Sequence, residues 1–271
     1  MAAVITSVRR RLDLPGVLHN IGAMNTQLGV ATEAPVRARV GRAPADRRFF
    51  MSMVVAIAVI VFVGFAPTFY LRPAFQSDSL PTVFAIHGTV FTAWIVLLVV
   101  QTALISARRT AVHRKLGVAG GGLAALMLIV GYMAAVTAAR RGFVTPGLPP
   151  PLVFFAIPLF DLIVFPLLVG AALYYRRTPA THKRLMLLST IAILTAAVAR
   201  LPGVLPYGPL MFFGLTNILV VAMLVYDWVT LGRVHSATIW GSLLFVLSQP
   251  LRIFISGTDA WLRVAHWLTG V

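Results

Sequence analysis

The sequence predicts an all-α integral membrane protein, folded as a bundle of seven transmembrane helices with its N-terminus inside and its C-terminus outside. Hydrophobic residues make up 59% of the 271 residues and charged residues only 11%, against roughly 45–50% and about 25% in soluble domains. The apolar residues form long runs, close to the roughly 20 residues that cross a bilayer. None of these runs alternates like a membrane-barrel strand, so helices are favoured over strands.

Seven apolar runs are long enough to span the membrane, and together they define a transmembrane domain over residues 49–256. The fifth run is the shortest, and Arg200 is expected to extend from its end towards the membrane surface. The seven spans are expected at residues 49–70, 82–106, 116–139, 151–175, 183–201, 207–231 and 236–256.

Two further segments flank this domain. Residues 1–48 are expected to form a flexible, basic cytoplasmic tail, because they lack the continuous apolar stretch of a signal peptide. Residues 257–271 are expected to hold a short interfacial helix, in which four apolar residues share one face. These four residues are Trp261, Val264, Ala265 and Leu268.

The formal net charge of +16 sets the expected orientation. With the N-terminus inside, 17 of the 23 Lys and Arg residues fall in the tail and the cytoplasmic loops, as the positive-inside rule requires. Because long apolar runs separate the basic residues, the expected partners are the lipid bilayer and anionic phospholipid head groups, and not nucleic acid. The predicted location is the plasma (inner) membrane of a bacterium, which the chain crosses several times.

A basic element that contains one histidine recurs in three cytoplasmic loops. Residues 108–116 resemble residues 176–185, and residues 232–235 form a reduced copy. Each copy places a histidine at the start of a helix, where the helix dipole disfavours the charged imidazolium and leaves the neutral, metal-binding form. Three such imidazoles can ligate zinc or copper or hold a haem, although contacts to lipid phosphate or simple topology charges fit the same loops. The histidines are His113, His182 and His235.

A second polar set lies deeper within the spans. Asp161 falls near the middle of the fourth span, where a carboxylate is costly and normally faces a partner or a cavity. His87 and Arg252 lie at matching depths, so Asp161 is expected to pair with one of them. The set fits a structural ion pair, a cofactor or quinone pocket, or a proton relay. Three uncharged polar residues share this depth: Asn217, Ser248 and Gln249.

Asp227 lies near the inner end of the sixth span. A carboxylate behind a metal-ligating histidine would orient the imidazole. The other expectation for Asp227 is an interfacial ion pair, with Arg233 as one candidate partner.

Several function classes are excluded because the sequence lacks the residue types or motifs that they require. The chain has no cysteine, which excludes disulfides, thiolate metal sites and iron–sulfur clusters. Lys115 and Lys183 are the only lysines, and neither falls in the seventh span, so a retinal Schiff base there is excluded. The sequence shows neither a phosphate-binding P-loop nor a serine-esterase motif, and it designates no catalytic residue.

Three motifs are similar to those of known membrane proteins: residues 113–117 (HRKLG), 182–187 (HKRLML) and 235–241 (HSATIWG). Together they resemble an uncharacterised family of bacterial multi-pass membrane proteins, across the second to seventh spans. HKRLM and His-x4-Trp also resemble motifs of small membrane proteins associated with cytochrome oxidase assembly, from which the seven spans and long tail depart. That second resemblance implies copper or haem handling, with the three histidines as candidate ligands.

The leading hypothesis is a histidine-dependent protein that binds a metal, a haem or a quinone and is linked to redox chemistry. One alternative is a proton-coupled transporter or channel that uses Asp161, and another is a non-catalytic lipid-binding or scaffold protein. The sequence leaves open whether the protein is an enzyme. The candidate metal ligands are His113, His182 and His235, with Asp227 behind them, and the candidate cofactor-binding residues are His87, Asp161 and Arg252.

Overall fold

A computed structural model describes residues 36–142 and 147–271, with side chains from Pro44 onward. The chain divides into two units, residues 1–45 and residues 46–271, and the helical bundle belongs to the second. Residues 1–35 of the expected tail lie outside the described residues. Residues 36–48 are helical, which differs from the expected flexible tail, because the Arg- and Ala-rich segment favours a helix and runs directly into the first apolar span.

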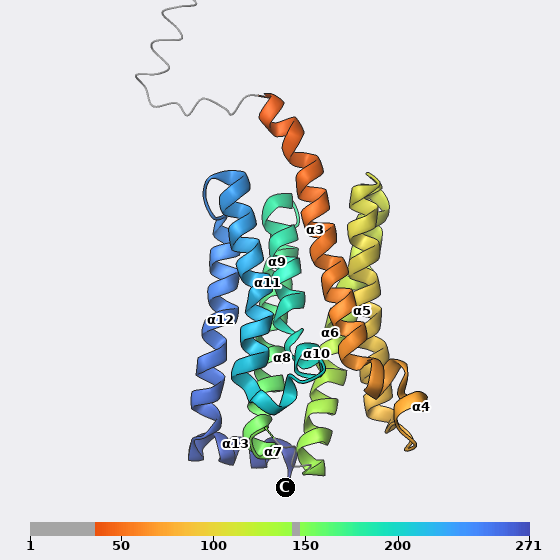
Figure 1. Cartoon of the computed structure of the whole chain (residues 1–271), viewed down its shortest axis with the longest axis vertical. Coiled ribbons are helices and arrows are strands. Elements are labelled where there is room, and N and C mark those ends of the chain that lie inside the picture. The colour runs from red at the N-terminus through yellow and green to blue at the C-terminus, as the bar shows by residue number, and fades with distance from the viewer. Residues whose placement is uncertain (1–35, 143–146) are drawn as a thin grey trace, which may run out of the picture. The chain divides into compact units, whose positions relative to one another are not determined.

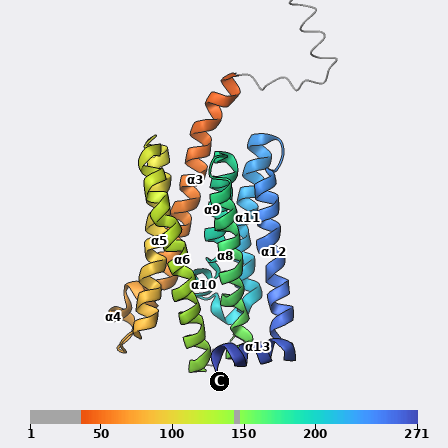
Figure 2. The same cartoon turned by 180° about the vertical axis from the view of Figure 1, so that it is seen from behind.

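The described residues form helices and no strand, and seven helical segments are long and apolar enough to cross a membrane. The prediction of an all-α seven-helix membrane bundle is therefore confirmed (Figures 1 and 2). The elements are α3 (Val36–Phe65) with η1 (Ala66–Tyr70), α4 (Arg72–Phe75), α5 (Thr82–Ser106), α6 (Thr110–Arg141), α7 (Pro151–Phe154), α8 (Ala156–Tyr174), α9 (Pro179–Ala192), α10 (Thr195–Ala199), η2 (Leu205–Tyr207), α11 (Gly208–Leu231), α12 (Ser236–Ser256) and α13 (Asp259–Thr269).

The outward faces of these helices are apolar. Val59 on α3, Ile218 on α11 and Leu247 on α12 are each more than half exposed. A soluble protein of this size would bury such side chains, because exposed apolar patches promote association in water. In a bilayer they face hydrocarbon, so the arrangement supports contact with lipid.

The expected helix boundaries differ from the structure mainly where charged residues stand. The bounds of α5 and α12 coincide with the expected spans. In contrast, α6 begins at Thr110, six residues before the expected start, and its first turns include Arg114 and Lys115. Both side chains are exposed, and long basic side chains are good helix formers that reach the membrane surface.

The fifth span is broken into α9 and α10, and it is the most buried of the seven. The break falls at Ile193 and Leu194, with no proline or glycine there. Non-helical backbone at membrane depth is tolerated where it lies inside the protein. This interior break places Thr195, the first residue of α10, beside the fourth span.

The amphipathic helix α13 follows the seventh span and packs across the bundle end. Trp261 and Ala265 are buried, and the Trp261 indole nitrogen donates to the Leu152 carbonyl at 2.8 Å. Val264 is instead 46% exposed and does not share their buried surroundings. The expected helix is therefore present, with three of its four expected residues turned inward.

The first span approaches α10 very closely at Gly64. A Cβ atom added to Gly64 would lie 2.2 Å from the carbonyl oxygen of Ala197. That oxygen belongs to the backbone, so it cannot move aside as a flexible side chain would. Only glycine fits between these two helices at this position.

We expect Gly64→Ala to lower the melting temperature in detergent, with a loss of about 1–3 kcal/mol from overpacking. Gly214→Ala is the matched control, because a Cβ at Gly214 in α11 would meet nothing within 4 Å. Equal melting temperatures for the two variants would contradict the close approach of α3 and α10.

Candidate functional site

Three loops lie at the same end of the bundle, which we call the loop end: those between α5 and α6, α8 and α9, and α11 and α12 (Figures 1 and 2). His113 and His182 are the fourth residues of α6 and α9, and His235 is the N-cap of α12. The structure therefore places all three predicted histidines at the loop end.

Two of these histidines lie close together. The ring centres of His113 and His182 are 6.3 Å apart, and the ring planes are nearly perpendicular, at 83°. The Nδ1 atom of His182 lies 2.8 Å from the Ala172 carbonyl oxygen. A carbonyl only accepts hydrogen bonds, so Nδ1 carries the proton and Nε2 is left as an available ligand atom.

Unpartnered polar atoms lie beside this pair. The Nδ1 atom of His113 is buried and has no hydrogen-bond partner in the described part of the chain. The Gln101 amide nitrogen donates to the His113 carbonyl at 3.2 Å, but its Oε1 is also buried without a partner. Buried polar atoms are normally hydrogen-bonded, so these two atoms mark a place where a ligand or water would be stabilised.

His235 has a different role. Its Nδ1 accepts the Ala237 backbone N–H at 3.1 Å, which caps the start of α12. Within the described ranges, no group of three or more His, Cys, Asp or Glu side chains is arranged to hold a metal ion. The three-histidine metal site stays a prediction, of which the structure assembles the pair His113 and His182.

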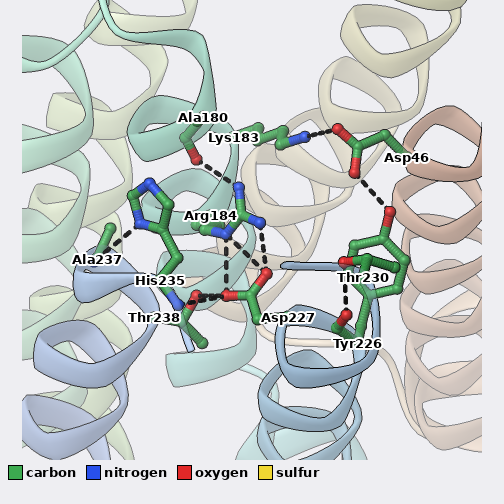
Figure 3. A network of polar contacts seen from close by, with 10 residues as sticks. All are labelled: Asp46, Ala180, Lys183, Arg184, Tyr226, Asp227, Thr230, His235, Ala237 and Thr238. Atoms are coloured by element: carbon green, nitrogen blue, oxygen red, sulfur yellow. Dashed lines mark hydrogen bonds and ion pairs between the residues drawn. The ribbon is translucent and has the colours of Figure 1, made fainter. Parts of the chain in front are cut away.

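Asp227 is held at the loop end by a buried arginine (Figure 3). The Arg184 Nε atom donates to both carboxylate oxygens at 3.0 Å, and Nη2 donates to Oδ1 as well. Asp227 also accepts the Thr238 hydroxyl and the His235 backbone N–H. The expected ion pair is therefore formed, but with Arg184 instead of Arg233, and the contact with His235 is to its backbone and not to its imidazole.

Asp46 joins the first span to the same network (Figure 3). Its carboxylate accepts the Lys183 ammonium and the Tyr226 hydroxyl. The Tyr226 ring stacks on Phe49 at 3.8 Å between ring centres, and the Lys183 ammonium lies 4.5 Å from the Phe50 ring centre. Asp46 and Lys183 thus connect α3, α9 and α11. The sequence did not predict this role, because Asp46 lies in the expected basic tail and Lys183 follows a basic loop.

The deeper set is organised around Arg252, which is fully buried. Its guanidinium pairs with Asp161 at 2.5 Å and donates to the Ile157 carbonyl at 3.2 Å and the Ser248 hydroxyl at 2.8 Å. Thr195 donates its hydroxyl to the other carboxylate oxygen of Asp161 at 3.2 Å. Of the two partners expected for Asp161, Arg252 is the one that it contacts.

His87 does not join this ion pair. Its ring lies 4.0 Å from the Phe91 ring centre, and its buried Nδ1 has no hydrogen-bond partner among the described residues. The hydrogen bonds of Asp161 in the described part of the chain are with Arg252 and Thr195, and none of them is with His87. The role of His87, Asp161 and Arg252 in cofactor binding stays a prediction.

No family model, curated protein or solved structure matches the chain. The resemblance to oxidase-assembly proteins stays an expectation, and the side chains themselves carry the functional interpretation.

We expect Arg184→Ala to destabilise the protein by about 3–5 kcal/mol, because it leaves the Asp227 carboxylate buried without its cation. Thermal melting of the purified protein in detergent measures the loss. Arg176→Ala is the control, because Arg176 is exposed in the neighbouring loop and surface changes cost within about 0.5 kcal/mol. A similar small change for both variants would contradict a buried ion pair.

The N-cap at His235 makes stability depend on pH. Burial lowers the pKa of His235, and the positive charges of Arg184 and Lys183 lower this pKa further. Arg233 acts in the same direction, while Asp227 opposes it. The folded state therefore keeps the imidazole neutral at a pH where the unfolded chain, with an ordinary pKa of about 6.5, already binds a proton.

The contribution of His235 should be fully present above about pH 6.5 and decline as the pH falls below that value. We expect His235→Asn, a cap that does not titrate, to flatten this part of the curve of melting temperature against pH. The wild type and the variant are compared in detergent from roughly pH 5 to pH 8. Parallel curves would show that the imidazole does not cap α12 in its neutral form.

Proposed function

We propose that this multi-pass membrane protein binds copper or a haem through His113 and His182 at its loop end and serves in electron transfer. We also propose that the loop end faces the cytoplasm from the bacterial inner membrane, because 17 of the 23 basic residues fall in the sequence of residues 1–48 and of the three loops. The observation that carries the proposal is the pair of imidazoles from separate hairpins, with unpartnered buried atoms beside them.

The separation of the two rings suits one bound metal. An ion midway between two imidazoles, about 2.0 Å from each ligating nitrogen, would place the ring centres about 6.2 Å apart. The observed separation is 6.3 Å. The perpendicular ring planes do not oppose this geometry, because each ring can rotate about its own bond to the metal.

The hydrogen bond from His182 to Ala172 also supports a ligand role. Metal-ligating histidines usually donate their second N–H to a carbonyl or carboxylate, which fixes the tautomer and the ring orientation. For His113, the unpartnered Nδ1 and the neighbouring Gln101 Oε1 would gain from a bound ligand. A buried polar group without a partner costs about 1–3 kcal/mol.

The donor set narrows the choice of metal. Two imidazoles, with no thiolate or carboxylate grouped with them among the described residues, disfavour calcium and magnesium, which prefer oxygen. Structural zinc takes four ligands from the protein. Copper(I) and haem iron are satisfied by two imidazoles, and the chemistry that either supplies when bound is one-electron transfer.

The test measures the copper and haem content of the full-length protein. The protein is expressed with copper or with haem supplied to the cells and is then purified in detergent. We expect the wild type to retain copper by elemental analysis or a haem absorbance band, and His182→Ala to lose it. His266→Ala is the matched control, because His266 lies on α13, away from the loop end. The proposal is wrong if the wild type retains neither, or if His182→Ala retains as much as the control.

A further inference from the structure

The seventh span has a polar buried face, although it lies in a membrane. Its buried side chains include six polar residues, spread over nearly the whole helix, whereas Leu247 and Phe254 on its outward face are 61% and 77% exposed. Such side chains often hydrogen-bond between membrane helices, but here they extend along nearly the whole helix. We call these six residues the polar face of α12: Thr238, Ser242, Ser248, Gln249, Arg252 and Ser256.

The polar face is long enough to cross the hydrocarbon. From Thr238 to Ser256 the rise is about 27 Å at 1.5 Å per residue, close to the core thickness of about 30 Å. One buried apolar residue, Phe245, stands within this face. Apolar constrictions of this kind can gate a water-lined path by excluding water.

Two carboxylates contact the polar face of α12, and each is held in the same way. At the loop end, Asp227 is held by Arg184 and accepts the Thr238 hydroxyl. Towards the other end, Asp161 is held by Arg252 and accepts a threonine hydroxyl from α10. Both carboxylates therefore contact the polar face of α12, Asp227 at the loop end and Asp161 through Arg252.

Between them, Ser242 points to a ligand. Ser242 is only 6% exposed, and its hydroxyl has no hydrogen-bond partner among the described residues. Further along, Asn217 and Gln249 exchange two hydrogen bonds of 2.9 Å. A hydroxyl both donates and accepts, so Ser242 can hold a water molecule that continues the chain of hydrogen bonds.

We propose that the polar face of α12 conducts protons between the two ends of the bundle, with Asp161 as its proton-carrying group. The proposal does not rest on the metal site. Protons need only a chain of hydroxyls, carboxylates and water along which to pass.

The contacts of Arg252 allow Asp161 to exchange its proton. When Asp161 takes up a proton, the carboxyl group loses its charge and its ion pair with Arg252 weakens. Arg252 still donates to the Ile157 carbonyl and the Ser248 hydroxyl, so its guanidinium is not left unpartnered. The proton then leaves Asp161 along the polar face, and the ion pair forms again.

The test is proton flux into liposomes that contain the purified full-length protein and a trapped pH-sensitive dye, driven by a potassium gradient with valinomycin. We expect the wild type to exceed protein-free liposomes. Ser242→Ala should fall to the protein-free rate while keeping its melting temperature, because the lost hydroxyl has no protein partner. Asp161→Asn should lose flux as well.

Ser52→Ala is the matched control, since it makes the same chemical change at an exposed position on α3 and should keep the wild-type rate. A wild-type rate equal to that of protein-free liposomes would overturn the proposal. So would wild-type flux in Ser242→Ala, even if Asp161→Asn fails to fold.

Discussion

The ion pair of Arg184 and Asp227 is the interaction on which the loop end depends. Both side chains are almost fully buried, and charges in such surroundings persist only when partners replace the lost water. Asp227 has three such partners, because besides Arg184 it accepts the Thr238 hydroxyl and the His235 backbone N–H. One carboxylate therefore joins α9, α11 and α12, and it fixes the start of α12 whose polar face extends from that point.

One turn of α9 connects this network to the histidine pair. His182, Lys183 and Arg184 are consecutive, and consecutive helical residues point about 100° apart. His182 faces α8 and the histidine of α6, Lys183 faces Asp46 in α3, and Arg184 faces Asp227 in α11. The position of the imidazole is thus coupled to four other spans, which gives a binding site at this place a rigid support.

The sequence predicted the spans well, because the length of an apolar run is imposed by the bilayer. It also limited the expected partners of Asp161 to His87 and Arg252, since few charges lie at that depth, and Arg252 is the partner in the structure. The roles of Lys183 and Arg184 were missed, because a basic residue before an apolar run has the same pattern whether it faces lipid head groups or a buried carboxylate. The break before Thr195 carries no proline or glycine, so tertiary packing alone creates it.

The position of α13 has a consequence for how the bundle is assembled. The helix α13 follows the seventh span on the side opposite the loop end, so it is made after all seven spans. There its Trp261 contacts the Leu152 carbonyl, and the Thr269 carbonyl accepts Arg140 from the end of α6. These contacts join segments made early in synthesis to one made after all spans. The contacts of α13 on that side of the bundle therefore form only after all seven spans have been made.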